Sequence, residues 1–160
     1  MRLSWLPMAC LAVLPAFGAL ANEPTDLVGT WLCTGQGGVY HDGFYPAGQN
    51  SYELVIAEQQ GPAFNGYYVW GWELTEYEFS PEDEDLPPYA VISEDRRSVR
   101  VTEQVLGVIG PRPDDFTMVD RLDTSRFDGA IVSSDRIEYT QVRPGEFAFA
   151  DLTVCERASD

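Results

Sequence analysis

The stretch LVGTWLCTG, residues 27–35, decides the fold class, because it is the first of several short apolar runs that end at turn residues. Runs of this length, with apolar side chains at alternate positions, are typical of β-strands with one buried face. No long segment beyond the apolar N-terminus shows the 3.6-residue period of a helix. We therefore predict an all-β protein, with strands at about 28–34, 51–58, 64–72, 99–109, 115–121, 127–133, 135–142 and 146–156.

Turn residues separate these strands in a way that favours a meander. QQGPA follows the second strand, GPRPDD the fourth and VRPGE the seventh, and each has Pro or Gly where the chain must reverse. A meander of eight strands removes its exposed edges by closing into a barrel. We predict one domain over 22–160, an eight-stranded antiparallel up-and-down barrel.

The connections give this barrel two unequal ends. Alternate connections of a meander lie at the same end, and those at one end are all short. The links 35–50 and 73–98 share the other end, and both exceed the usual length of a hairpin loop. Functional groups of barrels tend to lie in such loops and in the mouth that they surround. We expect any ligand at this end.

The first residues are typical of an export signal. Arg2 precedes a mostly apolar run, and Ala19-Leu20-Ala21 gives a small-x-small cleavage site. We predict a signal peptide over 1–21, no integral membrane segment after its cleavage, and a periplasmic or extracellular protein. The alternative, a lipoprotein attached at Cys10, fits the surrounding residues poorly.

Cleavage would leave two cysteines, Cys33 and Cys155. An even pair in an exported chain predicts a disulfide, which here would tie the first strand to the last. A metal site would need further ligands, and His41 is the sole histidine. We therefore predict a disulfide, with no metal site and no cofactor.

The charge of the chain restricts its partners and its chemistry. The net charge is −16, with 26 acidic residues, and all ten basic residues are Arg. This balance repels nucleic acid and anionic membrane surfaces, so we expect neither as a partner. The lack of Lys excludes a lysine nucleophile or Schiff base, and no Gly-x-Ser-x-Gly or HExxH motif occurs. The sequence specifies no oligomeric state.

Gly29-Thr30-Trp31 on the first strand, with Arg157 at the end of the last, resembles the calycin superfamily of lipocalins, avidins and fatty-acid-binding proteins. The early GTW, with Gly107-Val108-Ile109-Gly110 later, is also similar to a pattern in secreted bacterial proteins. The calycin resemblance implies that Trp31 plugs the closed end and that Arg157 packs across it. Both residues would then be structural, and the mouth would lie at the opposite end.

Five residues near the expected mouth are candidate ligand contacts. The link 35–50 is rich in glycine and carries His41 and Tyr45, so it is either a lid over the mouth or an Ω-loop packed on its own aromatics. Tyr52 is expected to point inward from the second strand. Trp70 and Trp72 lie on one face of the third, where they either stack on a ligand or form ordinary core.

Acidic residues provide two further hypotheses. Seven acids lie between Glu73 and Asp85, which favours a solvated surface loop over a calcium site, because their spacing matches no calcium loop. Asp120 and Asp151 are expected to point into the barrel, where carboxylates need partners or shifted pKa values. They would bond to inner neighbours, Gln141 or Tyr139, face a polar ligand, or act as a hydrolase pair. A shift of the strand register would instead place both on the surface.

The leading functional hypothesis is an exported, non-enzymatic protein that holds a small, partly apolar molecule in the open end of the barrel. One alternative is a cell-envelope interaction protein with a solid barrel and acidic loops. The other is a barrel enzyme of the allene-oxide-cyclase or dirigent type, for which His41 is the best candidate residue.

Overall fold

The computed structural model describes residues 24–73, 89–95, 97–122 and 124–159, and these form ten β-strands. The strands are β1 (Gly29–Tyr40), β2 (Phe44–Pro46), β3 (Asn50–Gln60), β4 (Ala63–Glu73), β5 (Ala90–Ile92), β6 (Ser98–Ile109), β7 (Asp115–Asp120), β8 (Arg126–Ser133), β9 (Arg136–Arg143) and β10 (Ala148–Arg157). No helix in the described ranges is long and apolar enough to cross a membrane.

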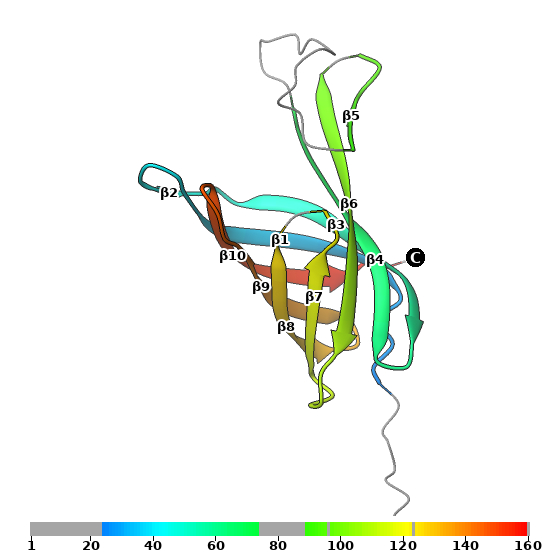
Figure 1. Ribbon diagram of the computed structural model, residues 1–160. Helices are drawn as coiled ribbons and strands as arrows, with labels where there is room; N and C mark the ends of the chain where they lie inside the picture. Colours follow the sequence, from blue (N-terminus) through cyan, green and yellow to red (C-terminus); the bar gives the residue numbers. More distant parts are fainter. Residues whose placement is uncertain (1–23, 74–88, 96, 123, 160) are drawn as a thin grey trace, which may run out of the picture.

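Eight of these strands form a closed antiparallel barrel. They pair in the order β1-β3-β4-β6-β7-β8-β9-β10, and β10 pairs again with β1. The two short strands lie outside this ring: β2 pairs with the end of β1, and β5 pairs with the projecting end of β6 (Figure 1). The predicted all-β, eight-stranded up-and-down barrel is therefore confirmed.

The first strand is longer than predicted. Residues 35–40 continue β1, because their backbone pairs with residues 148–153 of β10 and the chain then turns back through β2. The link 35–50 is thus largely a β-hairpin, so the expected Ω-loop is wrong, while a lid over the mouth stays a prediction. The glycines that indicated a loop are instead needed for strand pairing. A Cβ on Gly37 would come within 2.1 Å of the Ala150 carbonyl oxygen, so only glycine allows β1 and β10 to approach so closely there.

Side-chain alternation places the core as the sequence predicts. The side chains of the core cluster come from one face of each long strand, and they include Leu54, Ile56, Phe64, Tyr68, Phe116, Met118, Phe127, Ile137 and Tyr139. Phe147 does not belong to this core, although it has the same sequence parity as the inward-pointing Asp151. It precedes β10, is 54% exposed and stacks on His41, with ring centroids 4.0 Å apart.

One end of the barrel is closed around Trp31. Its indole is fully buried, and its Nε1 donates a hydrogen bond to the Leu27 carbonyl. The Arg157 guanidinium lies 4.3 Å from the ring centroid and donates to the carbonyls of Asp26, Val28 and Ser134. This geometry combines a cation–π contact with satisfaction of backbone acceptors.

Gly29 explains the first position of the Gly-x-Trp pattern. Its φ is +139°, a conformation that residues with a Cβ rarely adopt, and a Cβ there would lie 2.9 Å from Arg157 Nη1. The glycine therefore allows the arginine to reach its acceptors beside the buried indole.

The seam between the first and last strands carries the predicted disulfide, which is confirmed. Cys33 and Cys155 are opposite each other in the β1–β10 register and are bonded to each other. Both are buried. A structural disulfide is typical of proteins outside the reducing cytoplasm.

Candidate functional site

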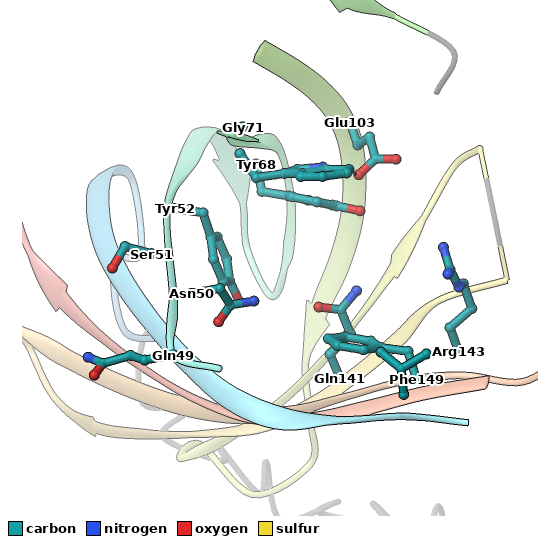
Figure 2. A pocket seen from close by; sticks show the side chains of 12 residues that line it. Gln49, Asn50, Ser51, Tyr52, Tyr68, Gly71, Glu103, Gln141, Arg143 and Phe149 are labelled. Atoms are coloured by element: carbon teal, nitrogen blue, oxygen red, sulfur yellow. Dashed lines mark hydrogen bonds between the residues drawn. The ribbon is translucent and has the colours of Figure 1, made fainter. Parts of the chain in front are cut away.

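A cavity of about 620 Å³ lies at the end of the barrel opposite Trp31 (Figure 2). Trp31 and Arg157 are register partners at one end of the β1–β10 pair, whereas Val39 and Phe149 are partners near the other. The cavity is lined by Val39, Gln49, Asn50, Ser51, Tyr52, Tyr68, Trp70, Gly71, Glu103, Gln141, Arg143 and Phe149. Its volume lies in the range of small-molecule pockets.

Aromatic side chains form much of the wall. Tyr52 comes from β3, Tyr68 and Trp70 from β4, and Phe149 from β10. Tyr52 meets Tyr68 edge to face, with ring centroids 6.2 Å apart. Trp70 Nε1 donates a 2.7 Å hydrogen bond to Glu103 Oε2. The wall therefore offers flat apolar ring faces, and the indole N–H of Trp70 is directed at a partner within the protein.

A layer of buried hydroxyls lies beneath this wall. The Tyr52 hydroxyl shares hydrogen bonds with the Tyr139 hydroxyl at 2.6 Å and with Thr153 Oγ1 at 3.0 Å. Burial raises the pKa of Tyr52 to about 12 and that of Tyr139 well above its usual value. These phenols are therefore neutral at physiological pH and act as hydrogen-bonding groups.

Tyr68 connects the wall to Asp120, which points inward as predicted. The Tyr68 hydroxyl donates to Asp120 Oδ2 at 2.7 Å, and the Leu122 backbone N–H donates to Oδ1 at 2.6 Å. Burial, followed by hydrogen bonds to Glu103 and Asp120, raises the pKa of Tyr68 above its usual value. The carboxylate thus bonds to inner neighbours, but these two hydrogen bonds come from Tyr68 and Leu122 and not from the expected Gln141 or Tyr139.

Asp151 also points inward and has a different environment. It is 6% exposed, and both of its carboxylate oxygens are buried without a hydrogen-bond partner in the described part of the chain. Burial raises the pKa of Asp151. The neighbouring Thr153 hydroxyl, Gln141 backbone N–H and Asn50 side chain lower this pKa, but their effect is smaller than that of burial. Asn50 and Gln141 line the cavity, so Asp151 lies next to two residues of its lining.

Glu103 is a cavity-lining side chain that the sequence analysis did not identify as a candidate. It projects inward from β6 between Val101 and Val105, both of which are buried. The sequence does contain an indication of this position, because Glu103 stands at one of the alternate positions of SVRVTEQVLGVI that are otherwise apolar and point inward. An acid at a core-facing position of a strand is the kind of local conflict that marks a candidate site.

The five predicted ligand contacts fall into three groups. Tyr52 and Trp70 line the cavity together. Trp72 pairs with Val99 through its backbone, and its side chain lies outside the described part of the structure. His41 and Tyr45 lie in or beside the β1–β2 hairpin and do not line the cavity; the Tyr45 hydroxyl donates to Asp42 at 2.7 Å. Their roles as ligand contacts stay predictions.

The acidic segment Glu73–Asp85 lies outside the described residues apart from the backbone and side chain of Glu73. Within the described ranges, no group of three or more His, Cys, Asp or Glu side chains is arranged to hold a metal ion. The arrangement is suited to enclosing an organic molecule between aromatic rings, with one carboxylate and several side-chain amides in the lining.

Comparison with known proteins adds a likeness of shape. No family model matches the chain, and no curated protein matches it. Among solved structures, the chain is similar to a redesigned β-barrel, with 13% sequence identity and a TM-score of 0.46. That match covers 83% of this chain and 92% of the other.

Proposed function

We propose that this protein is an exported binding protein that holds a small, partly apolar molecule in the open end of the barrel. The observation that carries the proposal is the cavity of about 620 Å³ between Tyr52, Tyr68, Trp70 and Phe149. Rigid strands hold these rings, and a site whose walls are already in place loses little entropy when the ligand enters.

The location of the cavity supports the same proposal. Trp31, Arg157 and the disulfide occupy the closed end and the seam, so the stabilising contacts and the cavity are at separate places. The disulfide also supports export, with residues 1–21 as the signal and the periplasm or the extracellular space as the destination. Mass measurement of the exported protein tests this part, and a mature chain that begins at Asn22 is expected.

The binding experiment uses the chain from residue 22 to 160, prepared with its disulfide intact. Intrinsic tryptophan fluorescence and thermal stability are followed across a panel of small amines, alcohols, carboxylates and sugars. A bound ligand raises the melting temperature in proportion to its concentration over Kd. Mass spectrometry of the recovered ligand separates binding from turnover, and the binding function predicts that it is unchanged.

Trp70→Ala is the test variant, and Tyr67→Ala is its matched control on the outer face of β4. Loss of the wall indole should weaken binding by about tenfold or more, whereas the control should stay within about twofold. A panel without any ligand that responds, or equal effects of the two variants, would contradict the proposal.

A further inference from the structure

We infer that the ligand carries an organic ammonium group, which binds at Glu103 while the apolar body of the ligand packs on Tyr52, Tyr68 and Trp70. The inference rests on the proposed binding function and specifies the chemical class of its ligand. Three observations support it: the polar atoms of the aromatic wall are hydrogen-bonded within the protein, the carboxylates inside the barrel carry negative charge, and aromatic rings lie beside Glu103.

The tyrosine hydroxyls of the wall are already committed to the protein. Tyr52 bonds to Tyr139 and Thr153, and Tyr68 bonds to Asp120. The indole N–H of Trp70 is likewise directed at Glu103. A ligand therefore meets the rings as apolar and π-rich surfaces, and Glu103 is the charged acceptor among the described lining residues.

Glu103 has acceptor capacity beyond its bond to Trp70. A carboxylate offers about four lone-pair sites, of which the Trp70 indole occupies one on Oε2 and the neighbouring Tyr68 hydroxyl takes up a second. Figure 2 shows Glu103 and Tyr68 on one wall of the cavity, with Gln141, Arg143 and Phe149 on the facing wall. An ammonium donor entering between these walls would reach the carboxylate beside aromatic faces, which also attract cations.

Negative charge inside the barrel strengthens this preference. Among the described residues, neither Glu103 nor Asp151 forms an ion pair with an arginine. Arg143 lies on the facing wall and has an interaction of its own. Asp151, whose buried carboxylate oxygens have no hydrogen-bond partner in the described part of the chain, adds a negative field from behind Asn50 and Gln141. A cation at Glu103 would offset the charge of that carboxylate, whereas an anion at the same position would be repelled.

The test compares three probes that share a phenyl ring and a short chain: 2-phenylethylammonium, 2-phenylethanol and 3-phenylpropionate. Calorimetric titrations into the wild-type protein at neutral pH and fixed ionic strength measure each Kd. We expect the ammonium to bind about tenfold or more tightly than the alcohol, and the carboxylate to bind more weakly than both. Raised salt should weaken the binding of the ammonium more than that of the alcohol.

Glu103→Gln supplies the second arm, with Glu53→Gln as control, because Glu53 is exposed on the outer face of β3. Glu103→Gln should remove most of the ammonium preference and leave the alcohol within about twofold, whereas the control should retain the preference. The wild-type comparison alone decides the inference if the variant does not fold.

The outcomes separate this inference from the proposed function. An alcohol or carboxylate that binds as well as the ammonium, in a manner sensitive to Trp70→Ala, overturns the ammonium inference and supports the cavity as a binding site. If no probe and no member of the wider panel binds, the proposed function fails and this inference fails with it.

Discussion

The indole nitrogen of Trp70 lies 2.7 Å from Glu103 Oε2 and donates a hydrogen bond to it, which joins the aromatic wall of the cavity to its carboxylate. The two residues come from neighbouring strands, β4 and β6, at the end of the barrel opposite Trp31. The bond fixes the ring and the acid relative to each other before any ligand arrives, which is the preorganisation that favours binding.

Tyr52→Phe should destabilise the protein by about 1–2 kcal/mol, because the Tyr139 and Thr153 hydroxyls lose a buried partner. Urea unfolding measures the change. Tyr67→Phe, on the outer face of β4, is the matched control and should be near neutral. Equal stabilities of the two variants would show that the buried hydroxyl layer contributes nothing.

Arg157→Ala should lower the free energy of unfolding by about 1–3 kcal/mol, because three backbone carbonyls lose their donor and Trp31 loses its cation–π contact. Ligand affinity at the opposite end should stay within about twofold of the wild-type value. A variant with full stability, or with impaired binding, would contradict the assignment of Arg157 to the closed end alone.

Reduction of the Cys33–Cys155 disulfide should cost about 2–5 kcal/mol, because the bond closes a long loop of 122 residues in the unfolded chain. Chemical denaturation with and without reductant measures the difference, and the Cys33→Ser, Cys155→Ser double variant should reproduce it. Unchanged stability after complete reduction would refute a role of the bond in closing the barrel.

Asp151→Asn should stabilise the protein at neutral pH by about 1 kcal/mol, because it removes a buried charge without a hydrogen-bond partner. Burial raises the pKa of Asp151 in the folded state above the ordinary 3.8. The folded state therefore holds the proton more tightly, and the contribution of Asp151 to stability falls as pH rises from 3.8 through the raised value. The gain from Asn should vanish in acid.

Asp128→Asn is the control of opposite sign. A hydrogen bond from Arg126 lowers the pKa of Asp128, so its contribution is present above its ordinary value of 3.8 and is lost as pH falls. Denaturant titrations across acid and neutral pH compare the two variants. The same pH trend in both would contradict the assigned environment of Asp151.

Tyr52 should ionise late in an alkaline titration. Burial, with a smaller effect of the negative Asp151, raises its pKa to about 12 from the ordinary 10.0, while its hydrogen bonds lower it. The unfolded state releases this proton first, so stability should fall as pH rises from 10 to 12. Phenolate absorbance of the wild type minus Tyr52→Phe measures the ionisation. A difference centred near 10 in the folded protein would be inconsistent with burial.

Alternation of side chains made much of the barrel predictable. The parity of Leu54, Ile56, Phe116 and Met118 places them inside, and the same parity places Asp120 and Asp151 there. The disulfide was predictable from two cysteines in a chain for which the sequence predicts export, because the prediction needs only their number and the expected compartment.

The differences arose where one residue type serves two structural purposes. Glycines at 35, 37 and 38 indicated a loop, but strands that approach closely also require glycine, and only the pairing with β10 distinguishes the two. Likewise, Glu103 has core parity, but an acid on a strand is ordinarily assigned to the surface until its partner Trp70 is seen. Cavities depend on contacts between distant strands, which a local pattern does not contain.

The most direct test is a nitrogen–proton NMR titration of ¹⁵N-labelled protein that follows the indole signals, assigned with Trp70→Phe and Trp31→Phe. The titrants are 2-phenylethylammonium, 2-phenylethanol and the members of the wider panel. If a ligand binds in the cavity, the Trp70 indole signal should shift. The Trp31 indole signal should not shift, because Trp31 is buried at the closed end. A ligand that shifts Trp31 but not Trp70, or a panel that shifts neither, would contradict binding at the open end of the barrel.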